Sequence, residues 1–194
     1  RTNFYKHPLF ILGSGKLGEK IYKKQFPRSE FIHVPSFDLD WSDLNSKNDD
    51  FCVYVDDAVD YGAITPWYKS YSTKYHSYYA CKDLDKFYYN LRSLFDKIED
   101  LFKKRVIVAA MGKYLHSNSK KFGDREIIYY QTNNLIKKSK IVIGHESSGL
   151  WQSIISNKKV IILDDPTFTN QKKENVKKMA YFMNLKVFDQ TKIT

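Results

Sequence analysis

The chain has 194 residues, enough to bury a substantial core and to form one large domain or two small ones. Its 15 tyrosines and 13 phenylalanines argue against a disordered chain. The formal net charge of +10 favours phosphorylated ligands, nucleic acid or an anionic membrane surface. The two cysteines lie in no metal-type spacing and indicate no disulfide scaffold, and no apolar run is long enough to span a bilayer.

The first part of the chain carries a glycine pattern between two apolar runs. Residues 9–12 predict a buried parallel strand, and Gly13-x-Gly15-x-x-Gly18 then leads into a short helix. A second strand is expected over residues 31–34. This order matches the dinucleotide-binding fingerprint and predicts an NAD(P)-binding oxidoreductase as an alternative function. In the other interpretation, the glycines only permit a tight turn.

Acidic residues follow the second run. Asp38 stands where the fingerprint has its acidic residue, and with Asp40 it forms a D-x-D pair that could bind a divalent metal. An Asx-rich turn explains the pair better, so we assign no metal site. The polar stretch over residues 43–50 is the best candidate boundary, and it predicts one domain over residues 1–50 and another over 51–194.

The next strand, over residues 51–55, ends in a pair of carboxylates, Asp56 and Asp57. Open α/β sheets bind ligands at the carboxyl ends of their parallel strands, so one of these two can serve as a general base. The other interpretation is that one aspartate caps the following turn. The loop over residues 61–79 is long and rich in Tyr and Ser, which favours a lid or an acceptor-facing loop.

The rest of the chain alternates between helical and strand patterns. Helices are expected over 83–104, from 123–126 to 138, and over 175–183; strands are expected over 106–110, 141–143, 159–163 and 186–188. Such alternation predicts an α/β fold with Rossmann-like parallel sheets, right-handed crossovers and flanking helices.

The stretch over residues 141–151 has the pattern of an anion site. After its strand, Gly144 makes a turn and Ser147 and Ser148 open a helix. The first turn of a helix presents unpaired N–H groups and a positive dipole end, to which hydroxyls add donors, so this start could bind a phosphate or a carboxylate. Alternatively, the serines serve only as a helix cap.

Three spaced segments, residues 37–40, 53–57 and 106–148, resemble one family. Together they are similar to bacterial surface and capsular polysaccharide biosynthesis proteins and, more distantly, to bacterial sialyltransferases and polysialyltransferases, which adopt the two-domain GT-B fold. The resemblance covers about residues 9–190. It implies a GT-B chain that lacks most of its N-terminal acceptor domain, since only two strands precede the spacer.

The sialyltransferase group carries a paired-acid motif that ends in Gly, and a Ser-Ser motif. By this resemblance Asp56 and Asp57 stand at the acids, with Asp57 the expected base and Ala58 in place of the Gly. Ser147 and Ser148 stand where hydroxyls hold the phosphate of a CMP-sugar.

The group's His-Pro motif reads Met111-Gly112 here, a departure from the pattern. That histidine normally helps to hold the phosphate or to protonate the leaving group, and His116 or His145 could substitute for it. With His116 as a catalytic candidate beside Asp56 and Asp57, the expected donor-binding residues are Met111, Gly112, Lys113, Arg125, Gly144, His145, Ser147 and Ser148.

The resemblance therefore implies an inverting glycosyltransferase, or a degenerate relative of one, that uses a CMP-linked donor and needs no metal or other cofactor. Its expected partners are the nucleotide-sugar and a surface glycan acceptor. The expected location is the cytoplasm, with peripheral contact at the anionic inner face of the membrane. A module that binds nucleic acid ranks last, because no aromatic-basic platform motif is present.

Overall fold

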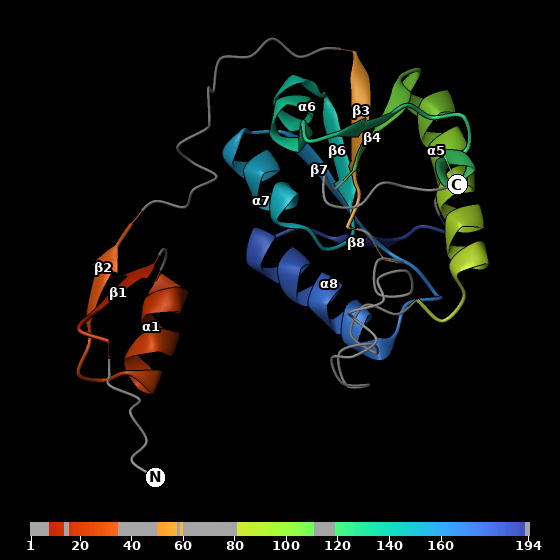
Figure 1. Cartoon of the computed structure of the whole chain (residues 1–194). Coiled ribbons are helices and arrows are strands. Elements are labelled where there is room, and N and C mark those ends of the chain that lie inside the picture. Colours follow the sequence, from red (N-terminus) through yellow and green to blue (C-terminus); the bar gives the residue numbers. More distant parts are fainter. Residues whose placement is uncertain are drawn as a thin grey trace. The chain divides into compact units, whose positions relative to one another are not determined.

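The structure is a computed structural model that describes residues 8–13, 16–34, 50–57, 59, 81–110 and 119–192 (Figure 1). The chain divides into two compact units, Arg1–Asp43 and Leu44–Thr194. No helix in the described ranges has both the length and the apolar content needed to cross a bilayer.

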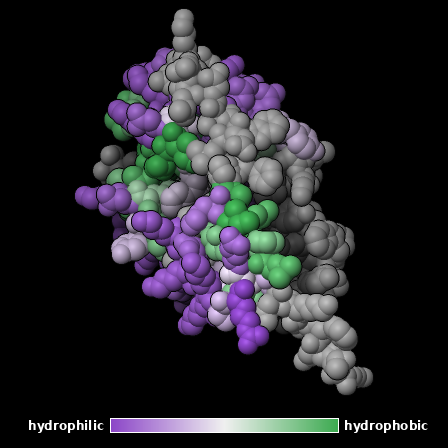
Figure 2. Space-filling view, turned by 90° about the vertical axis from the view of Figure 1, so that its left-hand side faces the viewer, coloured by the Kyte–Doolittle hydropathy of each residue, from purple (hydrophilic) through white to green (hydrophobic). Residues whose placement is uncertain are grey.

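The smaller unit is a single β-α-β crossover. It consists of β1 (Phe10–Gly13), α1 (Lys16–Gln25) and β2 (Glu30–His33), and the two strands pair in parallel. A Cβ atom on Gly13 would lie 2.7 Å from Cζ of Phe31, so the ring packs closely over this glycine. Figure 2 shows hydrophobic patches beside hydrophilic residues on one face. The smaller unit exposes several large apolar side chains, namely Leu9, Phe10, Leu12 and Ile21.

The larger unit is built on one six-stranded parallel sheet. Its strands are β3 (Phe51–Val55), β4 (Arg105–Ala110), β5 (Ile127–Tyr129), β6 (Ile141–Gly144), β7 (Lys159–Asp164) and β8 (Val187–Asp189). They lie in the order β5-β4-β3-β6-β7-β8, which is the doubly wound Rossmann order. The predicted α/β, Rossmann-like class is thereby confirmed. The winding reverses between β3 and β6, and ligands of such sheets bind at this switch point.

The helices cover the sheet on both faces. They are α5 (Leu84–Phe102), α6 (Thr132–Lys138), α7 (Ser148–Ile155) and α8 (Asn170–Met183), with a short 3₁₀ helix η2 (Ser119–Phe122). In Figure 1, α6 and α7 lie on one side of the sheet and α5 on the other. The helix predicted from residue 83 begins as expected, since the side chain of Asp83 accepts a hydrogen bond of 2.9 Å from the backbone N–H of Lys86.

One predicted helix is wrong in its first half. The segment from 123–126 to 138 was expected to be helical throughout, but it forms β5 and only then α6. Ile127 and Ile128 pair with Val108 and Ala109 of β4, because β-branched residues pack well on a sheet that still has an open edge. Tyr130, with φ of 60°, ends the strand before the helix begins.

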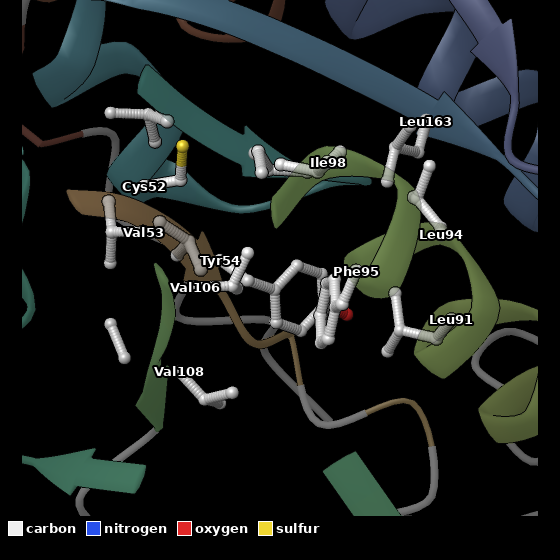
Figure 3. Packing of buried hydrophobic residues seen from close by; sticks show 14 of the residues in the cluster. Cys52, Val53, Tyr54, Leu91, Leu94, Phe95, Ile98, Val106, Val108 and Leu163 are labelled. Carbon is white, nitrogen blue, oxygen red and sulfur yellow. The ribbon is translucent and has the colours of Figure 1, made fainter. Parts of the chain in front are cut away.

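The central strands form the core. All five residues of β3 are buried, and Tyr54 packs its ring against Phe95 of α5 with the centroids 5.2 Å apart (Figure 3). Cys52 is fully buried at the start of this strand, as expected of a small hydrophobic residue. A tightly packed pair of layers therefore fixes the ends of β3 and β6, where the predicted acids and serines lie.

Candidate functional site at the switch point

The switch point brings the predicted acids and the predicted serine helix to the same edge of the sheet. Asp56 and Asp57 follow β3, and α7 begins four residues after its neighbour β6 ends. Gly149 allows a close approach, because an added Cβ atom would lie 3.1 Å from Cγ1 of Val55. A Cβ atom on Gly144 would lie 3.4 Å from the carbonyl oxygen of Val55, an ordinary contact. The first turn of α7 thus lies against the residue that precedes the two aspartates.

A buried lysine joins these two segments. The ammonium of Lys172, from the first turn of α8, lies 2.6 Å from Oδ2 of Asp57 and 3.1 Å from Oε2 of Glu146. The side chains of Lys172 and Asp57 are only 2% and 5% exposed, whereas that of Glu146 is 23% exposed. Burial by itself would lower the pKa of Lys172, but the two carboxylates outweigh it and raise that pKa, so the group stays cationic.

The second oxygen of Asp57 is buried without a donor. Among the described residues, Oδ1 has no hydrogen-bond partner. Nδ1 of His145 lies 4.0 Å from this oxygen, beyond hydrogen-bonding distance. Burial lowers the pKa of His145, so the ring is neutral near pH 7 and forms no ion pair with the aspartate. Buried carboxylate oxygens are normally hydrogen-bonded, so Oδ1 of Asp57 can accept a hydrogen bond from a bound ligand.

His145 itself lies in the core and not on a ligand-facing surface. Its ring is fully buried, and the nearest aromatic centroid, that of Phe168, is 5.0 Å away. Nε2 lies 3.1 Å from Oε1 of Gln190, and Nδ1 lies 3.2 Å from the hydroxyl of Tyr54. The amide of Gln190 donates to Asp165, which turns its oxygen toward the imidazole. Nε2 is therefore the donor, and Nδ1 accepts from Tyr54.

Asp165 anchors this network from the end of β7. Its carboxylate accepts hydrogen bonds from the side chain of Asn90 on α5, at 2.9 Å, and from the backbone N–H of Thr167, at 2.7 Å. Gln190, beyond β8, supplies a further donor. Because the donors come from three separate segments, the network holds α5, the end of β7 and the residue after β8 together at the carboxyl edge of the sheet.

The two serines have different environments. Ser147 is the N-cap of α7 in extended backbone, and its hydroxyl accepts a hydrogen bond of 3.3 Å from the N–H of Gly149. The capping interpretation therefore holds for this residue. Ser147 is half-buried and Ser148 is exposed, so the start of the helix is accessible from solvent.

Arg125 lies elsewhere. Its guanidinium pairs with Asp96 and, at 2.7 Å, with Glu99 of α5. The other oxygen of Glu99 accepts from the N–H of Val106, 2.7 Å away, at the start of β4. These residues lie at the amino-terminal edge of the sheet, opposite the serines, so the structure does not bring Arg125 to the expected donor site.

Several other expected residues lie outside the described part of the chain, namely Gly15, Asp38, Asp40, Met111, Gly112, Lys113 and His116. In the smaller unit, a Cβ atom on Gly18 would meet nothing within 4 Å. Close packing of helix against strand, the usual reason for the third glycine of the dinucleotide fingerprint, does not account for this one. Within the described ranges, no three His, Cys, Asp or Glu residues are placed to hold a metal ion.

Sequence reasoning missed Lys172 and Glu146. Lysine is abundant in this chain, and Lys172 lies before the helix predicted over residues 175–183, whereas α8 begins at Asn170. One signal was present: Lys172 shares the helical phase of Val176 and Ala180, the buried side of α8. A lysine in an apolar stripe needs a buried counter-charge, and the carboxylates that end the preceding strands are the natural candidates.

Comparison with known proteins adds little to this geometry. No protein-family model matches the chain, and no curated protein matches it. Among solved structures, the glycotransferase of kitacinnamycin is similar at 10% sequence identity, with a TM-score of 0.36. The match covers 85% of this chain but only 38% of that one. The assignment of function therefore depends on the site.

Proposed function

We propose that this chain is the nucleotide-sugar-binding part of a glycosyltransferase that passes a sugar from a CMP-linked donor to a hydroxyl of a surface glycan. The single observation that carries the proposal is the buried Oδ1 of Asp57, which has no hydrogen-bond donor among the described residues. It lies at the switch point of a Rossmann-type sheet, the usual place for a ligand.

The chemistry needs a base for the acceptor. In an inverting transfer, the acceptor oxygen attacks the anomeric carbon while its proton passes to a carboxylate, and the bond from that carbon to the phosphate oxygen breaks. Oδ1 of Asp57 has the free lone pairs to take this proton, since Oδ2 is the oxygen that binds Lys172. The acceptor hydroxyl would supply the donor that this buried oxygen lacks.

The leaving group needs stabilisation of negative charge. The start of α7 offers the exposed Ser148 and the positive end of the helix dipole, whereas the N–H groups of Gly149 and Leu150 already donate to Ser147. Its approach to Val55 keeps it next to the aspartates. Glu146 lies just before this turn, and Lys172 offsets its charge. A phosphate at the helix start and a base at the end of β3 would thus flank the reacting carbon. The GT-B type, the cytoplasmic location and contact with an anionic membrane remain parts of the proposal.

A ligand panel tests the donor. We expect CMP to raise the melting temperature of the protein more than UDP, GDP or NADH does. The gain should fall in Ser148→Ala, whereas Ser156→Ala, at the far end of the same helix, is the matched control and should leave it unchanged. Stabilisation by NADH alone would contradict the proposal and support the oxidoreductase alternative at Gly13–Gly18.

A further inference from the structure

We propose that Lys172 is a positioning residue, which holds Oδ2 of Asp57 so that Oδ1 is left facing the acceptor hydroxyl. The inference rests on the proposed function, because it assigns to Lys172 a part in setting up the same base. It starts from the unequal environments of the two carboxylate oxygens.

The first step is the geometry of the ion pair. The Nζ–Oδ2 distance of 2.6 Å is that of a charge-assisted hydrogen bond. Both side chains are almost completely buried, so little water competes for either partner. An aspartate has two side-chain dihedral angles, and a contact to one oxygen fixes which way the other oxygen points.

The second step is the alternative partner that Asp57 would have without the lysine. Nδ1 of His145 lies 4.0 Å from Oδ1, and at present it accepts from Tyr54. If Lys172 were removed, the carboxylate would turn toward the imidazole, which could donate from Nδ1 only by taking up a proton or changing tautomer. With Lys172 bound to Oδ2, Oδ1 stays 4.0 Å from Nδ1 and makes no hydrogen bond to it.

The third step concerns Glu146. Its Oε2 lies 3.1 Å from the same ammonium, as an ion pair without a hydrogen bond, and Glu146 is more exposed than Asp57. Lys172 thus ties the loop after β6, where the phosphate site begins, to the end of β3, where the base lies. Lys172 thus adds a side-chain link to the backbone packing that sets the distance between base and leaving group, and small displacements in such sites reduce rates strongly.

The imidazole nitrogens of His145 give a readout that needs no substrate. NMR spectra of protein labelled with ¹⁵N-histidine report on these nitrogens. The signals of His145 are assigned as those that are missing from the spectrum of His145→Gln. We expect the neutral Nε2–H tautomer in the wild type, and protonation or a tautomer change at Nδ1 in Lys172→Met. Lys172→Arg should preserve the wild-type signals, and so should the control Lys177→Met, which alters an exposed lysine on the same helix.

Turnover of a CMP-sugar gives the second readout. Lys172→Met should reduce kcat about 10- to 100-fold through misplacement of Asp57, with partial rescue in Lys172→Arg. If Lys172→Met does not fold, the double variant Glu146→Gln/Lys172→Met replaces it in both assays. This double variant should be more stable, because it has one uncompensated carboxylate fewer. Unchanged His145 signals in folded protein without Lys172 would overturn the inference, whatever the turnover. Absence of wild-type turnover would count against the proposed function alone, because the His145 readout does not depend on it.

Discussion

Lys172 is the residue whose loss should affect stability most clearly. Lys172→Met would leave Asp57 and Glu146 without their cation, with Asp57 only 5% exposed. Removing one partner of a buried ion pair costs about 3–5 kcal/mol, because the remaining charge stays desolvated. At roughly 2–4 °C per kcal/mol for a chain of this length, the melting temperature should fall by about 6–20 °C.

A double-mutant cycle separates this charge effect from lost packing. Asp57→Asn should cost less than Lys172→Met, since Glu146 remains as a partner for the lysine. Adding Asp57→Asn to Lys172→Met should restore stability by about 2 kcal/mol, because it removes the uncompensated charge.

Denaturant unfolding followed by circular dichroism gives these free energies, and hydrogen exchange of the β3 and β6 amides confirms which unit they describe. The exposed-site control, Lys177→Met, should stay within about 0.5 kcal/mol of the wild type. A cost below about 1 kcal/mol for Lys172→Met, with no coupling to Asp57, would refute the reasoning.

Four further predictions follow from other parts of the larger unit. The folded-state pKa of His145 lies below its ordinary value of 6.5, so as pH falls the unfolded chain binds a proton at this residue before the folded chain does. The free energy of unfolding should therefore decrease as pH falls from about 6.5 toward the folded-state pKa. Denaturant titrations across pH should show this decrease in the wild type and a weaker one in His145→Gln. Arg125→Met should destabilise the fold by about 1–3 kcal/mol while CMP affinity, measured calorimetrically, stays unchanged, since its partners lie at the opposite edge of the sheet. Gly149→Ala should cost about 1–3 kcal/mol in thermal unfolding, because its Cβ would lie 3.1 Å from a methyl of Val55. Burial raises the pKa of Cys52 to about 11, so a thiol-reactive dye should label Cys52 at pH 8 only after denaturation, as peptide mass spectrometry would show.

The sequence allowed the sheet to be predicted because its strands are short apolar runs that end in turn residues. The strand over 51–55 has the predicted bounds, and the helix after Asp83 ends within two residues of its expected limit. The missed strand β5 has only three residues, and its pairing with β4 depends on tertiary contacts that local periodicity does not contain.

The site was only partly predictable for the same reason. Asp57 and Ser147 follow strands, and the carboxyl ends of parallel strands meet at one edge, so their common location could be reasoned from the chain alone. Arg125 could not be placed, because its partners on α5 are set by packing. Lys172 and Gln190 reach the site from segments far along the chain, and only the folded structure identifies the side chains that they contact there.

The central claim is that Asp57 takes the proton of the acceptor at the switch point. The most direct test is the turnover of a CMP-sugar with a glycan acceptor by wild-type protein and by Asp57→Asn, with CMP affinity measured on both. We predict that the variant binds CMP as the wild type does and loses at least about 100-fold in kcat, the usual contribution of a general base. Turnover by Asp57→Asn at the wild-type rate would contradict the account.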